Sequence, residues 1–188
     1  MTCLLAKETP VFLGKRTPSR RVSILDPYSA SNPFSHETDL YAITLAHVDE
    51  AKALFKSGFS CSQAICAAFA EDYGIDRGMA LKLSCGFGAG MARSGNTCGA
   101  VTVALMVIGM KYGRTMAVDV AARDRTYAVV QAFMAEFLRR YTSVNCTDLI
   151  GYNLKNPEEY EQARAENLFH TRCAQLVHDA SQILESVL

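Results

Sequence analysis

The stretch that most constrains the fold is residues 99–110, which are apolar at every position except Thr102. A helix that is apolar on all its faces is stable only when other elements surround it. The stretch is also well short of the roughly 20 residues that a helix needs to span a membrane. We therefore expect a central helix buried among other helices, and not a membrane anchor.

Helical patterns flank this segment from Leu45 to the end of the chain, and Pro157 stands where a proline can open a helix. Glycines and capping residues mark the helix ends. The pattern predicts helices over about 47–56, from 60 to before 74, from about 76, over 99–110, over about 116–141, after 146, and twice within 157–188. The expected fold is therefore an all-α, single-domain helical bundle.

The helix over about 116–141 is predicted to be amphipathic, with an apolar stripe toward the core and arginines outside. The expected stripe consists of Val118, Ala122, Val129, Phe133 and Phe137, and the expected outer residues are Arg123, Arg125, Arg139 and Arg140.

The first 40 residues differ from the rest because they contain four of the five prolines, several serines and two basic pairs, without helical or strand periodicity. We expect residues 1–40 to form an irregular N-terminal arm and residues 41–188 to form the helical domain. The first 14 residues lack the long apolar run of a secretion signal, so a cytoplasmic location is expected.

The composition narrows the function. The chain is 49% hydrophobic and 20% charged, as in globular proteins, and 19 basic residues balance 19 acidic ones. No summed field directs such a protein to nucleic acid, so nucleic-acid binding is not expected. Gly86, Gly88 and Gly90 do not form a nucleotide-binding loop, because no strand precedes them and the spacing of the motif fails.

Seven cysteines exceed what packing requires, and none are spaced as in a thioredoxin motif or a zinc ribbon. Four of them instead follow capping residues, in the first turn of predicted helices. These four are Cys61, Cys98, Cys146 and Cys173. The expected capping residues are Ser60, which forms a capping box with Gln63, and Thr97, Asn145 and Thr171. Of the other three cysteines, Cys66 is expected to lie in the core and Cys3 in the arm. Cys85 is expected either to fill the core or to approach the site.

A helix N-terminus favours a thiolate by only about 0.3 to 1 kcal/mol, which lowers a thiol pKa by less than one unit. One helix end therefore does not ionise a thiol at neutral pH. Several converging helix ends, or a bound metal, would do so. The alternative is that each cysteine is simply a small buried apolar residue.

His170 is a possible nitrogen ligand if it shares a helix face with Cys173, and Arg93 is expected to be solvated.

From about residue 46 onward, the chain resembles the C-GCAxxG-C-C family of redox-active proteins. The matching stretches are residues 58–64, 86–93, 97–101, 145–151 and 168–173. The four cysteines shared by the family correspond to Cys61, Cys98, Cys146 and Cys173. A glycine expected near Cys98 is replaced here by Val103, so a close helix crossing is not expected at that point.

The resemblance implies a redox role, with genes often found beside transport or redox genes, and a similar domain in a multihaem cytochrome looks like an iron-sulfur carrier. No haem-attachment motif is present here. The leading hypothesis is that the four cysteines bind an iron-sulfur cluster or another thiophilic metal for electron transfer to an unknown redox partner.

Two other hypotheses remain open. In the first, the four cysteines form two reversible dithiol pairs, with Cys61 or Cys98 as the attacking thiolate. In the second, the protein is a non-catalytic helical module, with structural zinc or a membrane transporter as its partner.

Overall fold

The computed structural model describes residues 37–188, and side chains from residue 46 onward. Its elements are α1 (Glu37–Lys56), α2 (Cys61–Phe69), η1 (Ala70–Tyr73), α3 (Arg77–Ser84), η2 (Cys85–Phe87), α4 (Gly88–Met91), α5 (Gly99–Tyr112), α6 (Val120–Arg140), α7 (Cys146–Ile150), α8 (Pro157–Ala165) and α9 (Arg172–Val187). The described residues contain no strand beyond an isolated antiparallel bridge between Thr97 and Asn145. The predicted all-α fold is confirmed.

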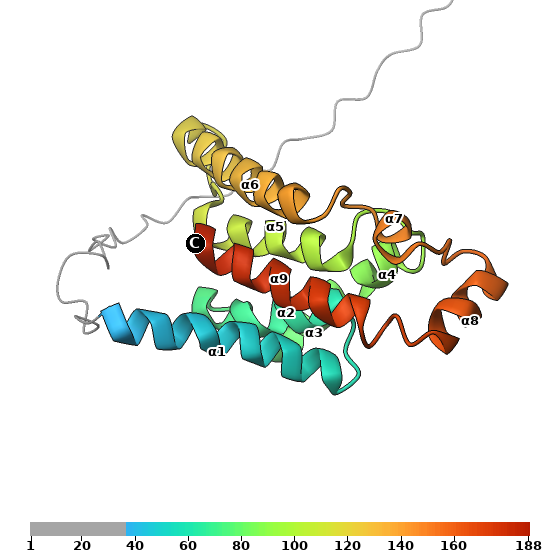
Figure 1. The fold of residues 1–188 in the computed structure, drawn as a ribbon. Coiled ribbons are helices and arrows are strands. Elements are labelled where there is room, and N and C mark those ends of the chain that lie inside the picture. The colour runs from blue at the N-terminus through green and yellow to red at the C-terminus, as the bar shows by residue number, and fades with distance from the viewer. Residues whose placement is uncertain (1–36) are drawn as a thin grey trace, which may run out of the picture. The chain divides into compact units, whose positions relative to one another are not determined.

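Helix α5 lies at the centre of the bundle, in contact with α2, α6 and α9 (Figure 1). Val101, Val103, Val107 and Ile108 are fully buried. The prediction of a buried central helix over residues 99–110 is therefore confirmed, with α5 extending to Tyr112. Among the helices of the described region, none is both long and apolar enough to cross a membrane.

The remaining long helices cover α5 and one another. Helix α1 packs on α2 and α9, while α6 packs on α5 and α9 (Figure 1). Phe69 of α2 and Phe133 and Phe137 of α6 are almost fully buried in the main core. Burying an aromatic side chain contributes about 1.5–3 kcal/mol each, so these residues are major sources of stability.

The structure differs from the sequence-based expectation at two helix starts. Helix α1 begins at Glu37, so residues 37–40 of the expected arm are helical; residues 1–36 lie outside the described region, and the division into arm and domain stays a prediction. Helix α6 begins at Val120, because the side chain of Asp119 accepts a hydrogen bond from the backbone of Ala122. Val118 precedes this cap and is 84% exposed, so its assignment to the apolar stripe is wrong.

A second, smaller apolar cluster holds α7 and α8. It contains the buried residues Cys146, Ile150, Leu154 and Ala163, and it lies apart from the main core. Arg172, the first residue of α9, donates from Nε to the carbonyl of Leu149 in α7 at 3.1 Å, and this hydrogen bond connects the two helices. This cluster therefore places the α7–α8 region beside the start of α9.

His47 of α1 contacts residues of three other elements, α2, η1 and α9. Its ring stacks on Phe69 at 4.7 Å, its Nδ1 lies 2.6 Å from a carboxylate oxygen of Glu185, and its Nε2 lies 3.1 Å from Asp72. The hydrogen bond to Glu185 raises the pKa of His47 above its usual 6.5, and burial opposes this shift. The ring of His47 thus links α1 to η1 and α9, and its protonation strengthens both contacts.

We predict that His47→Gln destabilises the protein more at about pH 5.5 than at about pH 8.5. A group whose pKa is raised by folding stabilises the folded state below its unfolded pKa, and this stabilisation is lost as the pH rises through the folded pKa. The loss at low pH should be about 1–2 kcal/mol, measured by urea unfolding. Replacing the exposed His170 by Gln is the control. An equal loss at both pH values would contradict the prediction.

Candidate functional site

Four cysteines from four helix starts surround one pocket of about 480 Å³. Cys61 is the first residue of α2, Cys98 is the N-cap of α5, Cys146 is the first residue of α7 and Cys173 is the second residue of α9. The sequence predicts these helix starts but not that they meet. The structure brings all four thiols to the same pocket.

The expected capping residues do not all cap. Ser60 forms the predicted capping box with Gln63 at the start of α2. The side chains of Asn145 and Thr171 make no capping hydrogen bond. The N-cap position of α5 is Cys98, not Thr97, and its side chain makes no capping hydrogen bond either. The predicted positions of these helix starts are correct, but among the four the predicted side-chain capping hydrogen bond forms only at α2.

The glycine-rich segment before α5 is a left-handed turn. All five residues from 89 to 93 have positive φ angles between 51° and 65°, and four of them are not glycine. For an L-residue this conformation costs about 1–2 kcal/mol each, so the surrounding structure must hold it. We call residues 89–93 the left-handed turn.

Close packing holds the left-handed turn in place. The backbone of Asn96 donates to the carbonyl of Gly90 at 3.1 Å. A Cβ atom on Gly90 would lie 2.6 Å from the Asn96 carbonyl and 2.7 Å from the Cβ of Cys146. Only glycine fits against these two neighbours, so the turn is packed directly onto a cysteine of the site.

A short antiparallel contact fixes Cys98 beside Cys146. The N–H of Cys98 donates to Val144 at 2.8 Å, and the N–H of Cys146 donates to Asn96 at 2.7 Å. These bonds flank the bridge between Thr97 and Asn145. The starts of α5 and α7 therefore form one unit, although 48 residues separate their cysteines.

Cys61 has the environment of a thiolate. The Cys98 thiol donates a hydrogen bond to its sulfur and, with the backbone N–H groups of Ala89, Ser62 and Ala100, lowers the pKa of Cys61 to about 7 against the opposing effect of burial. Ala89 belongs to the left-handed turn, and the other two N–H groups lie at the starts of α2 and α5. Converging N–H groups of this kind favour an anion.

Cys98 has the opposite tendency. Its hydrogen bond to Cys61, its burial and the charge of Cys61 raise its pKa well above the usual value. Cys98 is 3% exposed, whereas Cys61 is partly exposed to the pocket. The Cys61 thiol therefore ionises much more readily than the Cys98 thiol.

The other two thiols also stay protonated. Burial, followed by the charge of Cys61, raises the pKa of Cys146 to about 12. Burial also raises the pKa of Cys173, and the charges of Cys61 and Cys146 add to the effect. A first negative charge on Cys61 therefore opposes a second one in the same pocket.

An arginine and two aromatic side chains also line the pocket. Arg93, the last residue of the left-handed turn, lies 4.3 Å from the centre of the Tyr160 ring and donates to its hydroxyl at 3.3 Å. Tyr160 in turn packs on Phe169 at 5.4 Å. Arg93 is exposed, as expected, but it is held in place by Tyr160.

His170 lines the pocket but precedes α9, so it does not share a helix face with Cys173. In the described region, no group of three or more His, Cys, Asp or Glu side chains is arranged to hold a metal ion. The four thiols share a pocket without forming a preassembled site for a single ion.

The remaining cysteines divide clearly. Cys66 is fully buried in the main core, as predicted, and Cys3 lies outside the described residues. Cys85 is exposed and lines the pocket, so its core-filling alternative is wrong. The glycines that follow Cys85 were the only sequence feature that indicated its place at the pocket.

No sequence feature indicated that Tyr160 and Phe169 line the pocket, because their spacing is that of ordinary helix and loop residues.

Gly99 allows Cys61 to approach α5. A Cβ atom at this position would lie 2.8 Å from the Cys61 sulfur and 2.7 Å from the Phe87 carbonyl oxygen. A larger residue must therefore displace the thiol, the backbone, or both. Gly109, in the same helix, has no atom within 4 Å of such a Cβ.

We predict that Gly99→Ala raises the pKa of Cys61 above about 7, because the sulfur moves away from the N–H groups of α5. The protein should also lose about 1–3 kcal/mol of stability from overpacking. The pH dependence of alkylation at Cys61, read by peptide mass mapping, measures the first effect. Gly109→Ala is the control, and it should neither raise the pKa of Cys61 nor lower the stability of the protein. A folded Gly99→Ala protein with an unchanged profile would contradict this account of the thiolate.

The chain matches no curated protein and no solved structure. The family model described as "Putative redox-active protein (C_GCAxxG_C_C)" matches residues 59–187, a range that includes the left-handed turn and Cys61, Cys98, Cys146 and Cys173. The match covers more than half of the chain and coincides with the described helical region from α2 to α9. The chain therefore belongs to the C_GCAxxG_C_C family of redox-active proteins.

Proposed function

We propose that the pocket is a thiol–disulfide redox centre in which Cys61 is the attacking thiolate and Cys98 is the resolving thiol. The observation that carries this proposal is the hydrogen bond from the Cys98 thiol to a Cys61 sulfur whose pKa is about 7. An attacking thiol works best when its pKa is near the ambient pH, because it is then ionised without losing much nucleophilicity. A buried, protonated neighbour is suited to the second step.

The reaction would proceed in two exchanges. The Cys61 thiolate attacks one sulfur of a disulfide substrate, so a Cys61–substrate disulfide forms and the other half of the substrate leaves as a thiolate. The Cys98 thiol then loses its proton to solvent and attacks the Cys61 sulfur, which releases the second half of the substrate. In total, two protein thiols are oxidised to a disulfide and the substrate disulfide is reduced to two thiols.

The difference in exposure supports these roles. Cys61 is partly exposed to the pocket, whereas Cys98 is 3% exposed. A substrate therefore meets Cys61 first. We assign Cys146 and Cys173 to a second dithiol pair in the same pocket, since burial and the charge of Cys61 keep both protonated until the first pair has reacted.

An iron-sulfur cluster is the second candidate. Four cysteine thiolates are the usual ligand set of such a cluster, and Cys61, Cys98, Cys146 and Cys173 line one pocket. When bound, a cluster would supply one-electron transfer. A single structural zinc fits less well, because it requires four sulfurs about 2.3 Å from one point, and the described side chains include no group arranged to hold one ion.

The dithiol chemistry also bears on location and partners. Free thiols persist in the reducing cytoplasm, where we propose that the protein acts. Its partner would be a redox protein or small thiol that reduces the Cys61–Cys98 disulfide again. A non-catalytic role beside a membrane transporter would leave the ionised Cys61 without a use, so we rank it below the two redox functions.

We predict that Cys98→Ser traps a mixed disulfide on Cys61. Without the resolving thiol, the adduct formed with hydroxyethyl disulfide should persist at least about tenfold longer than in the unaltered protein. Intact-protein and peptide mass spectrometry measure its lifetime and position. Cys66→Ala, which removes a thiol of the main core, is the control and should trap nothing. Rapid loss of the adduct in Cys98→Ser would exclude Cys98 as the resolving residue.

A further inference from the structure

From the wall of the pocket we infer that its substrate is a small organic disulfide, or the corresponding thiol, that carries an anionic group such as a carboxylate, with Arg93 as the residue that binds the anion. The inference rests on the proposed thiol chemistry of Cys61 and adds the class of molecule on which that chemistry acts.

Charge is the first argument. Among the described residues that line the pocket, Arg93 is the sole member of the Lys, Arg, Asp and Glu group. The other lining residues are mainly aromatic, aliphatic or sulfur-containing, and no carboxylate lies there to repel an anion. Apart from the Cys61 thiolate, Arg93 is therefore the one fixed charge among these lining residues, and it attracts the anionic group of a substrate.

The second argument is that the charge of Arg93 is not neutralised. Several other arginines of the described region contact acids; for example, Arg77 lies 2.7 Å from Glu50, and Arg139 lies 2.7 Å from Glu136. Within that region, no carboxylate lies within 4.0 Å of Arg93, which contacts the ring and hydroxyl of Tyr160 instead. The aromatic contact orients the guanidinium and leaves N–H groups available for an anion, which arginine binds through two parallel hydrogen bonds.

The left-handed turn supplies the third argument, because it connects the cation to the reactive sulfur. Its first residue, Ala89, donates its N–H to Cys61, and its last residue is Arg93. The backbone of both residues has positive φ, 53° and 65° respectively. A strained backbone that persists because its surroundings hold it typically belongs to a functional site. Here one rigid turn holds both the thiolate and the cation.

The remaining walls accommodate the body of such a molecule. Phe55, Phe59, Ile150 and Phe169 line the pocket, and its volume of about 480 Å³ is within the usual range for small-ligand sites. The substrate is therefore expected to combine an apolar or aromatic body with one anionic end.

The disulfide itself is the oxidant in this scheme. A bond forms between the Cys61 sulfur and one substrate sulfur while the substrate S–S bond breaks, and its electron pair leaves with the second sulfur as a thiolate. Cys98 then displaces the bound half, which also leaves as a thiolate. Arg93 neither gives nor takes a proton; it binds the anionic group of the substrate beside Cys61.

The test compares two aromatic disulfides with the full-length protein. Dithiobis(nitrobenzoate) carries two carboxylates, whereas dithiodipyridine is uncharged at neutral pH, and peptide mass mapping assigns the reaction at Cys61. Arg93→Gln should slow the anionic probe about tenfold, as expected for one lost charge contact, and change the rate for the neutral probe by less than about twofold. Arg93→Lys, which retains the charge, should keep most of the preference.

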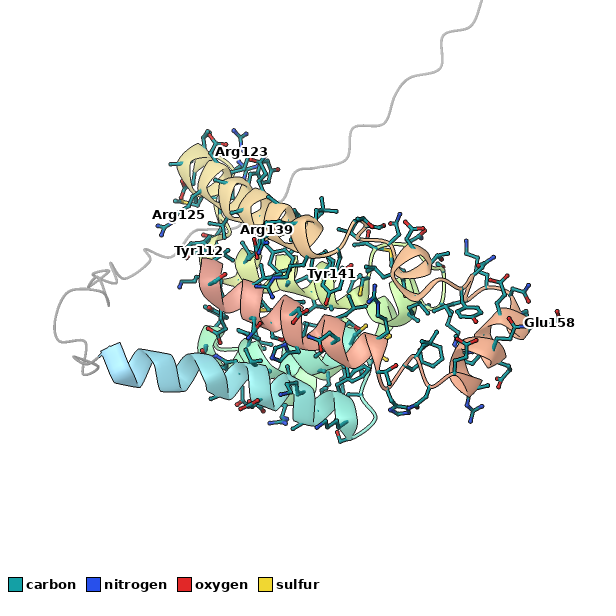
Figure 2. The ribbon with its side chains drawn as sticks, in the orientation of Figure 1. Tyr112, Arg123, Arg125, Arg139, Tyr141 and Glu158 are labelled. Atoms are coloured by element: carbon teal, nitrogen blue, oxygen red, sulfur yellow. The ribbon has the colours of Figure 1, made fainter. Side chains whose placement is uncertain are left out.

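Arg125→Gln is the matched control, because Arg125 also lies over a tyrosine ring, 4.5 Å from the centre of Tyr112. This pair lies at the other end of the bundle from α8 (Figure 2). Its removal should leave both rates unchanged. If Arg93→Gln slows both probes equally, or neither, the anion inference is wrong while the thiol chemistry stands. If neither probe reacts at Cys61 in the unaltered protein, the proposed function fails.

Discussion

The left-handed turn at residues 89–93 is the constraint on which the site depends. Four non-glycine residues in this conformation cost several kcal/mol, at about 1–2 kcal/mol each, and the packing of Gly90 against Asn96 and Cys146 holds them there. In return, the turn directs the N–H of Ala89 toward Cys61 and carries Arg93 at the pocket wall. If the turn relaxed to a right-handed form, the thiolate would lose a donor and the α5–α7 unit would lose its contact. The strain and the reactivity of Cys61 are thus two consequences of one backbone arrangement.

A balance between burial and hydrogen bonding makes the four thiols unequal. Burial raises the pKa of a thiol, and it dominates at Cys146 and Cys173. At Cys61 the hydrogen bonds outweigh it, because N–H groups from three elements and the thiol of Cys98 all converge on one sulfur. Since a negative charge on Cys61 opposes ionisation of its neighbours, the pocket carries one reactive thiolate at a time. Four chemically identical side chains thereby differ in their tendency to ionise, as the proposed order of attacking and resolving steps requires.

The sequence predicted the parts of the molecule that depend on local patterns. The buried helix over residues 99–110 and the capping box at Ser60 follow from apolar content and from short-range hydrogen bonding, and both are confirmed. The convergence of the cysteines depends on how distant helices pack, and spacing along the chain does not contain that information. The left-handed conformation of residues 89–93 was not predicted, because it is imposed by Asn96 and Cys146 and not by the residues of the turn. The exposure of Val118 was missed for a local reason: the cap at Asp119 starts the helix at Val120, later than the predicted start near residue 116, so Val118 lies outside the helix.

The central claim is that thiols, with Cys61 and Cys98 foremost, carry the electrons in this pocket. The most direct measurement is a redox titration of protein purified without oxygen, in which free thiols are counted, disulfides are mapped and the visible spectrum is recorded at each potential. The account predicts that the first oxidation removes two thiols, that these are Cys61 and Cys98 joined as a disulfide, and that no visible band changes. A visible band that bleaches on reduction, together with iron and sulfide in matching amounts and no change in the number of thiols, would contradict it and identify the pocket as a cluster site.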